Sequence, residues 1–372
     1  MAVGVGVWGT GNMGRGSLRA IGGHPDLELR ALVTSSPDKA GRDAASFLDG
    51  PAGGPAPTGG EQAGAGVVAT TDRSAFAASG CAAVVYAASG DIRPDEAAED
   101  VEGLLAEGIS VVTPSLYALY DPASAPPELR ERMEAACAAG RSALFVSGVD
   151  PGWGNDLLPL LATGLCHSIR EVRAQEIFDY STYDQEFSVR ELVGMGKPLD
   201  EVPPMVAPGV PTMVWGGQLR LMARALGVQL DAVEEHLERR PLEEDITCAL
   251  GDFAAGTQGA MRFEVVGVVD GVPMLVVEHV TRIHPSVAPD WPQPTSGAGS
   301  HRVLVEGEPR LAITVEAESE GGNRAAGGNA TAAMRLVGAI PWLVANAPGI
   351  FDAADVPLEP GRGRTVATGG GG

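Results

Sequence analysis

Short hydrophobic runs alternate with longer amphipathic stretches over the first 150 residues of the chain. Nearly every residue in these runs is apolar, which is typical of strands in a parallel sheet that is covered on both faces. The predicted strands are residues 3–8, 27–33, 67–70, 82–88, 109–113 and 142–146, and helices are expected at 13–21, 94–107 and 126–139. Strands that alternate with helices predict an α/β Rossmann fold, a doubly wound parallel sheet.

The pattern changes after residue 152, where the strand candidates become longer and follow one another directly. Helices are expected at 155–165, 186–195 and 212–226, and strands at 169–180, 261–269, 272–283, 302–306 and 311–317. Asp270-Gly271 separates two of these strands, and glycine accepts the positive φ angles of a tight hairpin turn. These features predict an α+β second domain with a mixed or antiparallel sheet.

A glycine-rich motif follows the first predicted strand and opens the first predicted helix. It comprises Gly9, Thr10, Gly11, Asn12, Met13 and Gly14, with the spacing Gly-x-Gly-x-x-Gly. In a strand–turn–helix context, these glycines allow a tight turn, close approach of a pyrophosphate, and close packing of the helix on the strand. The motif predicts a dinucleotide bound against the helix N-terminus.

The end of the second predicted strand bears on which dinucleotide is bound. An NAD site usually has an acidic residue there to bind the ribose 2′-hydroxyl, and none is present. Ser35, Ser36 and Lys39 follow the strand instead, and they are suited to a 2′-phosphate. Ser36 before Pro37 also fits an ordinary helix N-cap, and both roles are compatible. We therefore expect NADP(H) to be preferred, with NAD(H) possible.

Two further strand ends supply candidate residues for chemistry. Ala87, Ala88 and Ser89 follow the fourth strand, where small residues allow the nicotinamide to approach, and Asp91 is the nearest carboxylate. Reduction of a C=O or C=N bond also needs a proton donor. The candidate catalytic residues are Asp91, Tyr117, Tyr180 and Tyr183, although packing is the simpler role for each tyrosine and a loop or helix cap for Asp91.

Composition narrows the range of partners. The net charge of −22 argues against nucleic acid and membrane surfaces and favours a small-molecule substrate. The four cysteines have no Cys-x-x-Cys spacing, the six histidines do not cluster, and no signal peptide is apparent. We therefore expect no metal site and a cytoplasmic protein, and the long strands of the second domain suggest a homodimer.

The motifs together resemble the dihydrodipicolinate reductase-like superfamily, and more closely its branch of 2,4-diaminopentanoate dehydrogenases and native amine dehydrogenases. The resemblance covers about residues 1–362. It is carried by Trp8-Gly9-Thr10-Gly11-Asn12, Ser35-Ser36-Pro37-Asp38-Lys39, Gly148-Val149-Asp150-Pro151-Gly152, Asp179-Tyr180-Ser181-Thr182-Tyr183-Asp184 and Glu278-His279-Val280-Thr281-Arg282. We expect four segments: a dinucleotide-binding Rossmann domain (1–152), a substrate and oligomerisation domain (153–328), a C-terminal helix returning to the Rossmann domain (329–364) and a disordered tail (365–372).

The resemblance implies an NAD(P)H-dependent oxidoreductase that transfers hydride at a C–N centre. The chain lacks the paired histidines and the Pro-Ser-Gly-Thr segment of true dihydrodipicolinate reductases, which argues against that activity. It also lacks the glutamate that amine dehydrogenases carry just after the fifth strand, because this segment reads Thr113-Pro114-Ser115-Leu116-Tyr117. An NADPH-dependent carbonyl reductase and a non-catalytic NAD(P)-binding sensor therefore stay open as alternatives.

Overall fold

The computed structural model describes residues 2–48, 64–90, 92–183, 185–319, 322–361 and 365. The chain forms two compact units, Met1–Gly148 with Asn329–Gly372, and Val149–Gly328. The tail expected at 365–372 lies outside the described residues, except for residue 365.

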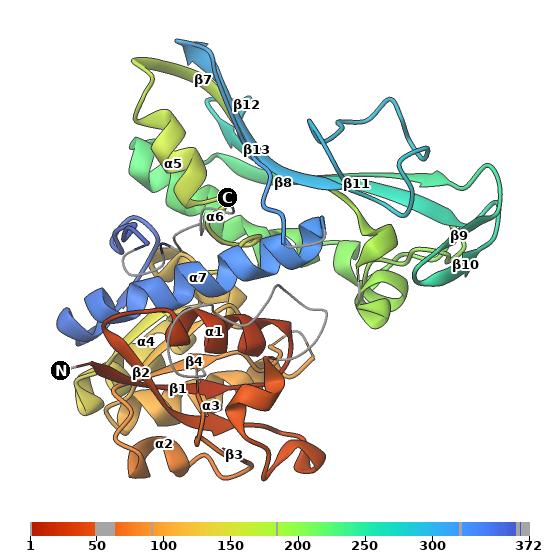
Figure 1. Ribbon diagram of the computed structural model, residues 1–372. Helices are drawn as coiled ribbons and strands as arrows, with labels where there is room; N and C mark the ends of the chain where they lie inside the picture. Colours follow the sequence, from red (N-terminus) through yellow and green to blue (C-terminus); the bar gives the residue numbers. More distant parts are fainter. Residues whose placement is uncertain are drawn as a thin grey trace, which may run out of the picture. The chain divides into compact units, whose positions relative to one another are not determined.

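The first unit is built on a seven-stranded sheet (Figure 1). In spatial order its strands are β15 (Gly349–Phe351), β6 (Ala143–Val146), β5 (Ser110–Thr113), β4 (Ala83–Tyr86), β1 (Val3–Trp8), β2 (Leu27–Val33) and β3 (Ala69–Thr70). All neighbouring strands pair in parallel. The order from β3 to β6 is that of a dinucleotide-binding Rossmann sheet, which confirms the predicted fold class.

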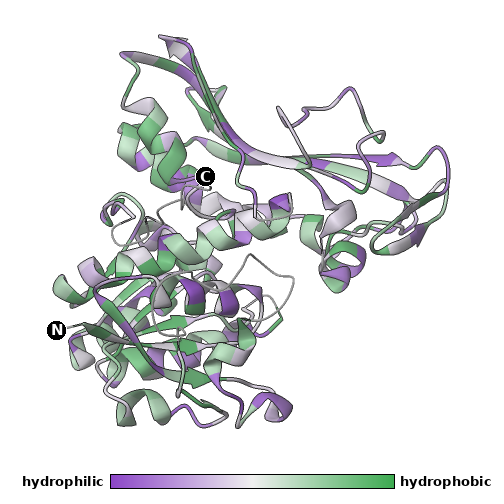
Figure 2. Cartoon of the chain, in the orientation of Figure 1, coloured by the Kyte–Doolittle hydropathy of each residue, from purple (hydrophilic) through white to green (hydrophobic). Residues whose placement is uncertain are grey.

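Helices cover both faces of this sheet. They are α1 (Asn12–Gly22), α2 (Ala75–Ala78), α3 (Pro94–Ala106), α4 (Pro127–Gly140) and α7 (Arg324–Ala345), the last of which begins in the second unit. Side chains of α1 and α7 share one hydrophobic core with alternate strand residues, and those of α2, α3 and α4 share the other. Strands β4, β5 and β6 are mostly apolar (Figure 2), because every residue in them is buried.

The second unit contains a six-stranded sheet. Its spatial order is β14 (Leu311–Val315), β13 (Gly299–Glu308), β7 (Ser168–Asp179), β12 (Val272–Arg282), β11 (Gln258–Val269) and β8 (Ala232–Pro241). Only β12 and β7 pair in parallel, so the sheet is mixed, which confirms the prediction for this domain. Asp270 and Gly271 both have positive φ angles, of 52° and 75°, at the hairpin between β11 and β12.

Shorter elements complete the second unit. They are helices α5 (Leu157–Thr163) and α6 (Val210–Leu226), the 3₁₀ turn η5 (Tyr180–Thr182), the π-turn η6 (Ser188–Leu192), and a small hairpin of β9 (Ile246–Cys248) and β10 (Gly251–Phe253). The carboxylate of Glu235 on β8 accepts hydrogen bonds from the amides of Gly209 and Thr212, which fixes the start of α6 against the sheet. Among the described residues, no helix is long and apolar enough to cross a membrane.

Candidate active site

The glycine-rich loop connects β1 to α1 in the first unit. Gly9 has a φ angle of 124°, and a Cβ atom there would lie 2.8 Å from the carbonyl oxygen of Ala87. A Cβ atom on Gly14 would lie 2.0 Å from the carbonyl oxygen of Gly9. Both positions therefore require glycine, because a side chain would push the loop away from β4 or the helix away from the loop.

The start of α1 fits the diphosphate of a dinucleotide. Gly11 occupies the N-cap position of α1, and no side chain caps this end of the helix. The first turn of α1 contains no acidic residue. A Cβ atom on Gly11 would meet no atom within 4 Å, so the space in front of these amides is open. The first amides and the positive end of the helix dipole favour an anion here.

Lys39 lies next to this loop. Its Nζ atom donates a hydrogen bond of 3.1 Å to Oγ1 of Thr10. The Thr10 hydroxyl also lies 3.5 Å from the hydroxyl of Thr34, which accepts a hydrogen bond from the amide of Ser36. The side chain of Lys39 and the turn at Ser36 are therefore attached to the glycine loop, while Ser35 is exposed.

The other cofactor candidates lie where β4 ends. Ala87 contacts the glycine loop, as its proximity to Gly9 shows, and the carbonyl oxygen of Ala88 accepts a 2.6 Å hydrogen bond from Oγ of Ser115. Ser89 is exposed. The loop and the ends of β2 and β4 thus meet at one edge of the sheet, as expected for parallel strands.

Two candidate catalytic residues belong to the first unit. Asp91 lies outside the described residues. Tyr117 is half-buried in a 3₁₀ turn after β5, with its ring stacked on that of Tyr120 at a centroid distance of 6.4 Å. It also packs against the core that contains α3 and α4, so its ring has a structural role.

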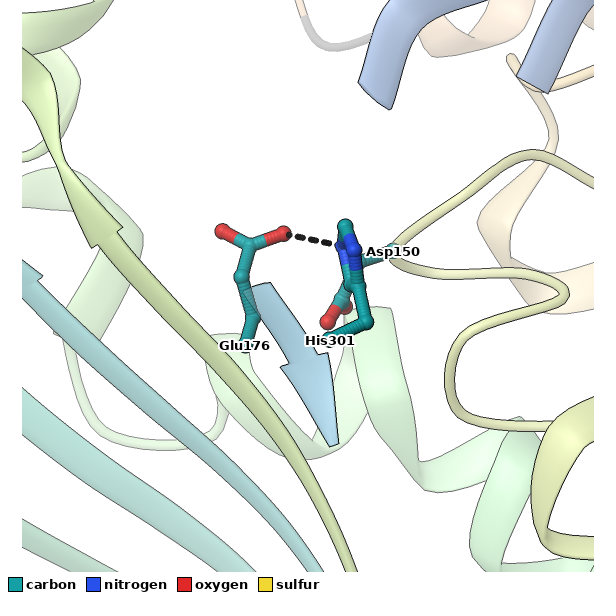
Figure 3. A group of neighbouring side chains, drawn as sticks. All are labelled: Asp150, Glu176 and His301. Atoms are coloured by element: carbon teal, nitrogen blue, oxygen red, sulfur yellow. Dashed lines mark ion pairs between the residues drawn. The ribbon is translucent and has the colours of Figure 1, made fainter. Parts of the chain in front are cut away.

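The second unit gathers acids and histidines on one face of its sheet. His279 on β12 and His301 on β13 are both register partners of Glu176 on β7, the strand between them. Side chains directly opposite one another on adjacent strands lie on the same face and within contact distance. Figure 3 shows Glu176 and His301 pointing toward each other from neighbouring strands, with Asp150 beside them.

Glu176 is the centre of this group. Its carboxylate lies 3.4 Å from Nε2 of His301 and 3.8 Å from Nδ1 of His279, and it accepts a 3.2 Å hydrogen bond from the hydroxyl of Tyr180. Its side chain is 12% exposed, against 5% for His279 and 3% for His301. Glu176 is thus the most accessible member of a nearly buried set.

Asp150 is held more tightly. Its Oδ1 atom accepts hydrogen bonds of 2.6 Å from Asn155 and 2.5 Å from the Trp215 indole, and it lies 3.0 Å from Nε2 of His279. This last distance is that of an ion pair, although the ring N–H points too far off line for a hydrogen bond. The amide of Gly152 donates a hydrogen bond to Oδ1 of Asn155, which closes the turn that follows Asp150. We refer to Asp150, Glu176, His279 and His301 as the acid–histidine cluster.

The cluster raises the pKa values of its own member His279 and of the neighbouring Tyr180. Burial alone lowers the pKa of His279, but the carboxylates of Asp150, Glu176 and Glu278 outweigh this effect and raise it above its ordinary value. Burial and the nearby carboxylate of Glu176 raise the pKa of Tyr180 well above its ordinary value. The charged imidazolium and the neutral phenol are therefore favoured.

Aromatic rings surround the cluster. Phe263 stacks on His279 and Trp215 meets it edge-on, each at 4.5 Å between centroids. Trp153 and Phe178 pack against His301, and the ring of Tyr183 lies 4.9 Å from that of Tyr180. Carboxylates enclosed by aromatic rings suit an organic ammonium ion, through charge and cation–π attraction.

Side chains of the acid–histidine cluster are also of the types that bind metal ions. One ligand atom each from Asp150, Glu176 and His301 lie within 4.8 Å of one another. However, the Asp150 Oδ1 atom and the Glu176 Oε1 atom already accept hydrogen bonds from other side chains. The donor set is thus better matched to a protonated amine than to a divalent ion.

The sequence identified only part of this site. Tyr180 and Tyr183 were predicted as candidates, and both lie beside the cluster. Glu176 and His301 were not singled out, and Asp150 and His279 were named only within the motifs that carry the family resemblance. The missing signal was the pairing of β7 with β12 and β13, because no local pattern specifies which distant strands become neighbours.

Comparison with known proteins places the chain among dehydrogenases. Residues 155–363 match the family model of the 2,4-diaminopentanoate dehydrogenase C-terminal domain. An amine dehydrogenase from Streptomyces virginiae is 56% identical over 362 residues, which cover 96% of this chain and 97% of that protein. The 2,4-diaminopentanoate dehydrogenase of Acetoanaerobium sticklandii is 24% identical over 71% of this chain and 70% of its own length.

Solved structures agree on the fold. The amine dehydrogenase from Mycobacterium smegmatis superimposes with a TM-score of 0.73 at 19% identity, covering 96% of this chain and 97% of that chain. GenD2 from gentamicin A biosynthesis, solved in complex with NAD, has a TM-score of 0.52 at 17% identity and covers 95% of this chain and 90% of its own.

Proposed function

The chain belongs to the family of 2,4-diaminopentanoate dehydrogenases and amine dehydrogenases, and from this premise we propose that it is an amine dehydrogenase that prefers NADP(H). It is an NAD(P)H-dependent oxidoreductase that transfers hydride at a C–N centre. The missing glutamate after β5 left a carbonyl reductase and a non-catalytic sensor open as alternatives. The relatives are dehydrogenases that act on amines, and they do not favour either alternative.

The preference for NADP(H) depends on one observation, the contact between Lys39 and Thr10. The ammonium group lies beside the glycine loop, at the end of β2, where the ribose 2′ position of a dinucleotide is recognised in this fold. A cation there attracts a 2′-phosphate, whereas the acidic residue that would bind a 2′-hydroxyl is absent. When bound, the cofactor supplies the hydride acceptor, and the chain's own residues must handle the protons.

The amine itself is proposed to bind at the acid–histidine cluster. The cluster combines two carboxylates with aromatic rings, and its members Glu176, His279 and His301 lie in the segment that the family model matches. Carboxylates close to the reacting nitrogen can take up the proton that an alkylammonium ion must lose before hydride leaves the adjacent carbon.

A steady-state assay tests the proposed function. Purified protein is incubated with a panel of primary alkyl and arylalkyl amines and either NADP⁺ or NAD⁺, and the absorbance of the reduced cofactor is followed. We expect turnover of at least one amine, with kcat/KM at least about tenfold higher for NADP⁺. Equal or better use of NAD⁺ would refute the cofactor preference alone.

The same assay run in reverse separates the alternatives. Ketones with NADPH are expected to react only when ammonium is present, giving the amine. Alcohol formed without ammonium would identify a carbonyl reductase instead. Tight NADPH binding without turnover of any amine or ketone would support the sensor.

We also propose that the protein is a cytoplasmic homodimer. All four cysteines are free thiols, which suits a reducing compartment. The sheet face opposite the acid–histidine cluster carries Arg173, Arg262, Glu264 and Glu278 in one ion-pair network. A face that carries both signs of charge can complement a second copy of itself about a twofold axis.

A further inference from the structure

We propose that Glu176 is the catalytic acid–base residue of this enzyme, in place of the glutamate that related amine dehydrogenases carry after the fifth strand. We further infer that Asp150 and His279 form a positioning pair that holds the site in its active arrangement. Both inferences rest on the proposed function, because they assign residues to the amine reaction.

The segment after β5 offers no substitute for the missing acid. Residues 113–120 contain no Asp, Glu or His. The hydroxyls of Thr113 and Ser115 are engaged locally, since Thr113 accepts from the amide of Ser115 at 3.0 Å and Ser115 donates to the carbonyl of Ala88 at 2.6 Å. The hydroxyl of Tyr120 donates to the carbonyl of Pro114 at 3.3 Å. We therefore place the proton acceptor in the acid–histidine cluster.

Exposure and hydrogen bonding distinguish the two carboxylates of the cluster. The Asp150 side chain is 2% exposed, and its Oδ1 atom is approached by Asn155, Trp215 and His279. Glu176 is 12% exposed and accepts a hydrogen bond only from Tyr180 in the described structure. Its Oε2 atom faces only His301, at 3.4 Å. Glu176 therefore has the free acceptor capacity that a substrate ammonium ion needs.

The charges around Glu176 favour a cationic substrate. The titratable groups that face it are Tyr180 from η5, His279 from β12, His301 from β13 and Asp150 from the turn. Two carboxylates thus face one side chain, His279, whose imidazolium form is favoured by its raised pKa. An alkylammonium ion beside Glu176 would give the carboxylates a second cationic partner, which supplies the attraction for binding.

The protons can be followed through the oxidative direction. The Glu176 carboxylate takes one proton from the ammonium group, which leaves a neutral amine. The cofactor, when bound, would accept the hydride of the α-carbon, and the nitrogen lone pair would form the C=N bond of an iminium ion. The protonated Glu176 next loses its proton to solvent. The carboxylate then takes a proton from the water that attacks the iminium carbon.

The same residue completes the reaction. Glu176 returns the proton to the nitrogen of the carbinolamine, ammonia leaves as the C–N bond breaks, and the remaining hydroxyl proton passes to the released ammonia. The sum is alkylammonium ion, water and oxidised cofactor giving ketone or aldehyde, ammonium, reduced cofactor and one proton. One carboxylate therefore suffices: it acts as the base while the iminium ion forms, and as base and then acid while the iminium ion is hydrolysed.

Neighbouring residues orient the Glu176 carboxylate. Tyr180 remains a neutral donor because its pKa is raised, so its hydrogen bond fixes Oε1 of Glu176. His279 lies between the two carboxylates, with one ring nitrogen toward each. Tyr180, which the sequence suggested as a proton donor, thus acts as a positioning residue.

The direct test is Glu176→Gln, which keeps the size of the side chain but removes the base. We expect kcat for amine oxidation to fall about 10²–10⁴-fold, with NADPH affinity and melting temperature unchanged. Glu171→Gln is the matched control, because Glu171 is on the same strand, pairs with Arg173 and faces the other side of the sheet. The control is expected to keep wild-type activity.

Chemical rescue separates catalysis from structure. In Glu176→Ala, added formate should restore turnover in proportion to its concentration, because it can occupy the space of the missing carboxylate. A merely structural glutamate would not give this response. Dialysis of the wild type against EDTA should leave its activity unchanged, and activity that is lost and then restored by a divalent ion would replace this proposal with a metal site.

The possible failures are distinguishable. If the wild type oxidises amines but Glu176→Gln stays within about threefold of it, the assignment of Glu176 is wrong while the proposed function stands. If the wild type oxidises no amine although it binds NADPH, the proposed function itself fails.

Discussion

At the scale of single residues, we propose that Lys39 determines the choice of cofactor. A charge-assisted hydrogen bond contributes about 1.5–3 kcal/mol, so Lys39→Ala should lower kcat/KM with NADP⁺ by roughly 10–150-fold and leave NAD⁺ use nearly unchanged. Lys197→Ala is the control, because Lys197 is the only other lysine and pairs with Glu191 in the second unit. Equal losses with both cofactors would contradict a 2′-phosphate contact.

The sequence indicates some of the candidate residues and not others. The difference is whether a site is built from consecutive elements or from strands that are distant in the sequence. The glycine loop and Lys39 were found from the sequence, since strand, loop and helix follow one another directly. Their contact, Lys39 to Thr10, joins residues at the ends of adjacent parallel strands, which the fold class already implies. Glu176 and His301 lie on strands with no local sign of a shared site.

At the scale of elements, we propose that the N-terminus of α1 binds the diphosphate of the dinucleotide. Gly11→Leu should leave the fold intact, because a Cβ atom there meets nothing, yet its side chain would fill the space for the diphosphate. We expect the NADPH dissociation constant to rise at least about tenfold in a fluorescence titration, with the melting temperature of the cofactor-free protein unchanged. Gly23→Ala at the other end of α1 is the control, since its Cβ would meet only the Arg19 carbonyl, at 3.7 Å. Wild-type affinity in Gly11→Leu would refute the assigned diphosphate position.

Four strands were not predicted: the short pair β9 and β10, and two strands at the edges of the larger sheets, β8 and β15. β8 is rich in charged residues, so its sequence lacks the apolar alternation of a half-buried strand. It pairs only with β11, and an edge strand can carry charges that a central one cannot. β15 has three residues, which is too short for a periodic pattern, and it forms because β6 offers an open edge.

At the scale of the whole molecule, the charged face of the mixed sheet predicts the oligomeric state. Light scattering should give twice the chain mass of 38.1 kDa. Arg262 is 26% exposed within the network of Arg173, Glu264 and Glu278, so Arg262→Glu should add repulsion and shift the equilibrium toward single chains. Arg310→Glu, on a side chain that is 77% exposed outside this network, is the control. A wild-type mass of one chain at micromolar concentration would refute the dimer.

The sequence by itself determined the class of both domains, the glycine loop and the family. These depend on local order: buried parallel strands are mostly apolar, tight turns favour glycine, and the first amides of a helix can bind an anion. Only the tertiary structure decided where the acids meet. Strand pairing brings Glu176 between His279 and His301, and pairing between distant strands depends on the packing of the whole sheet.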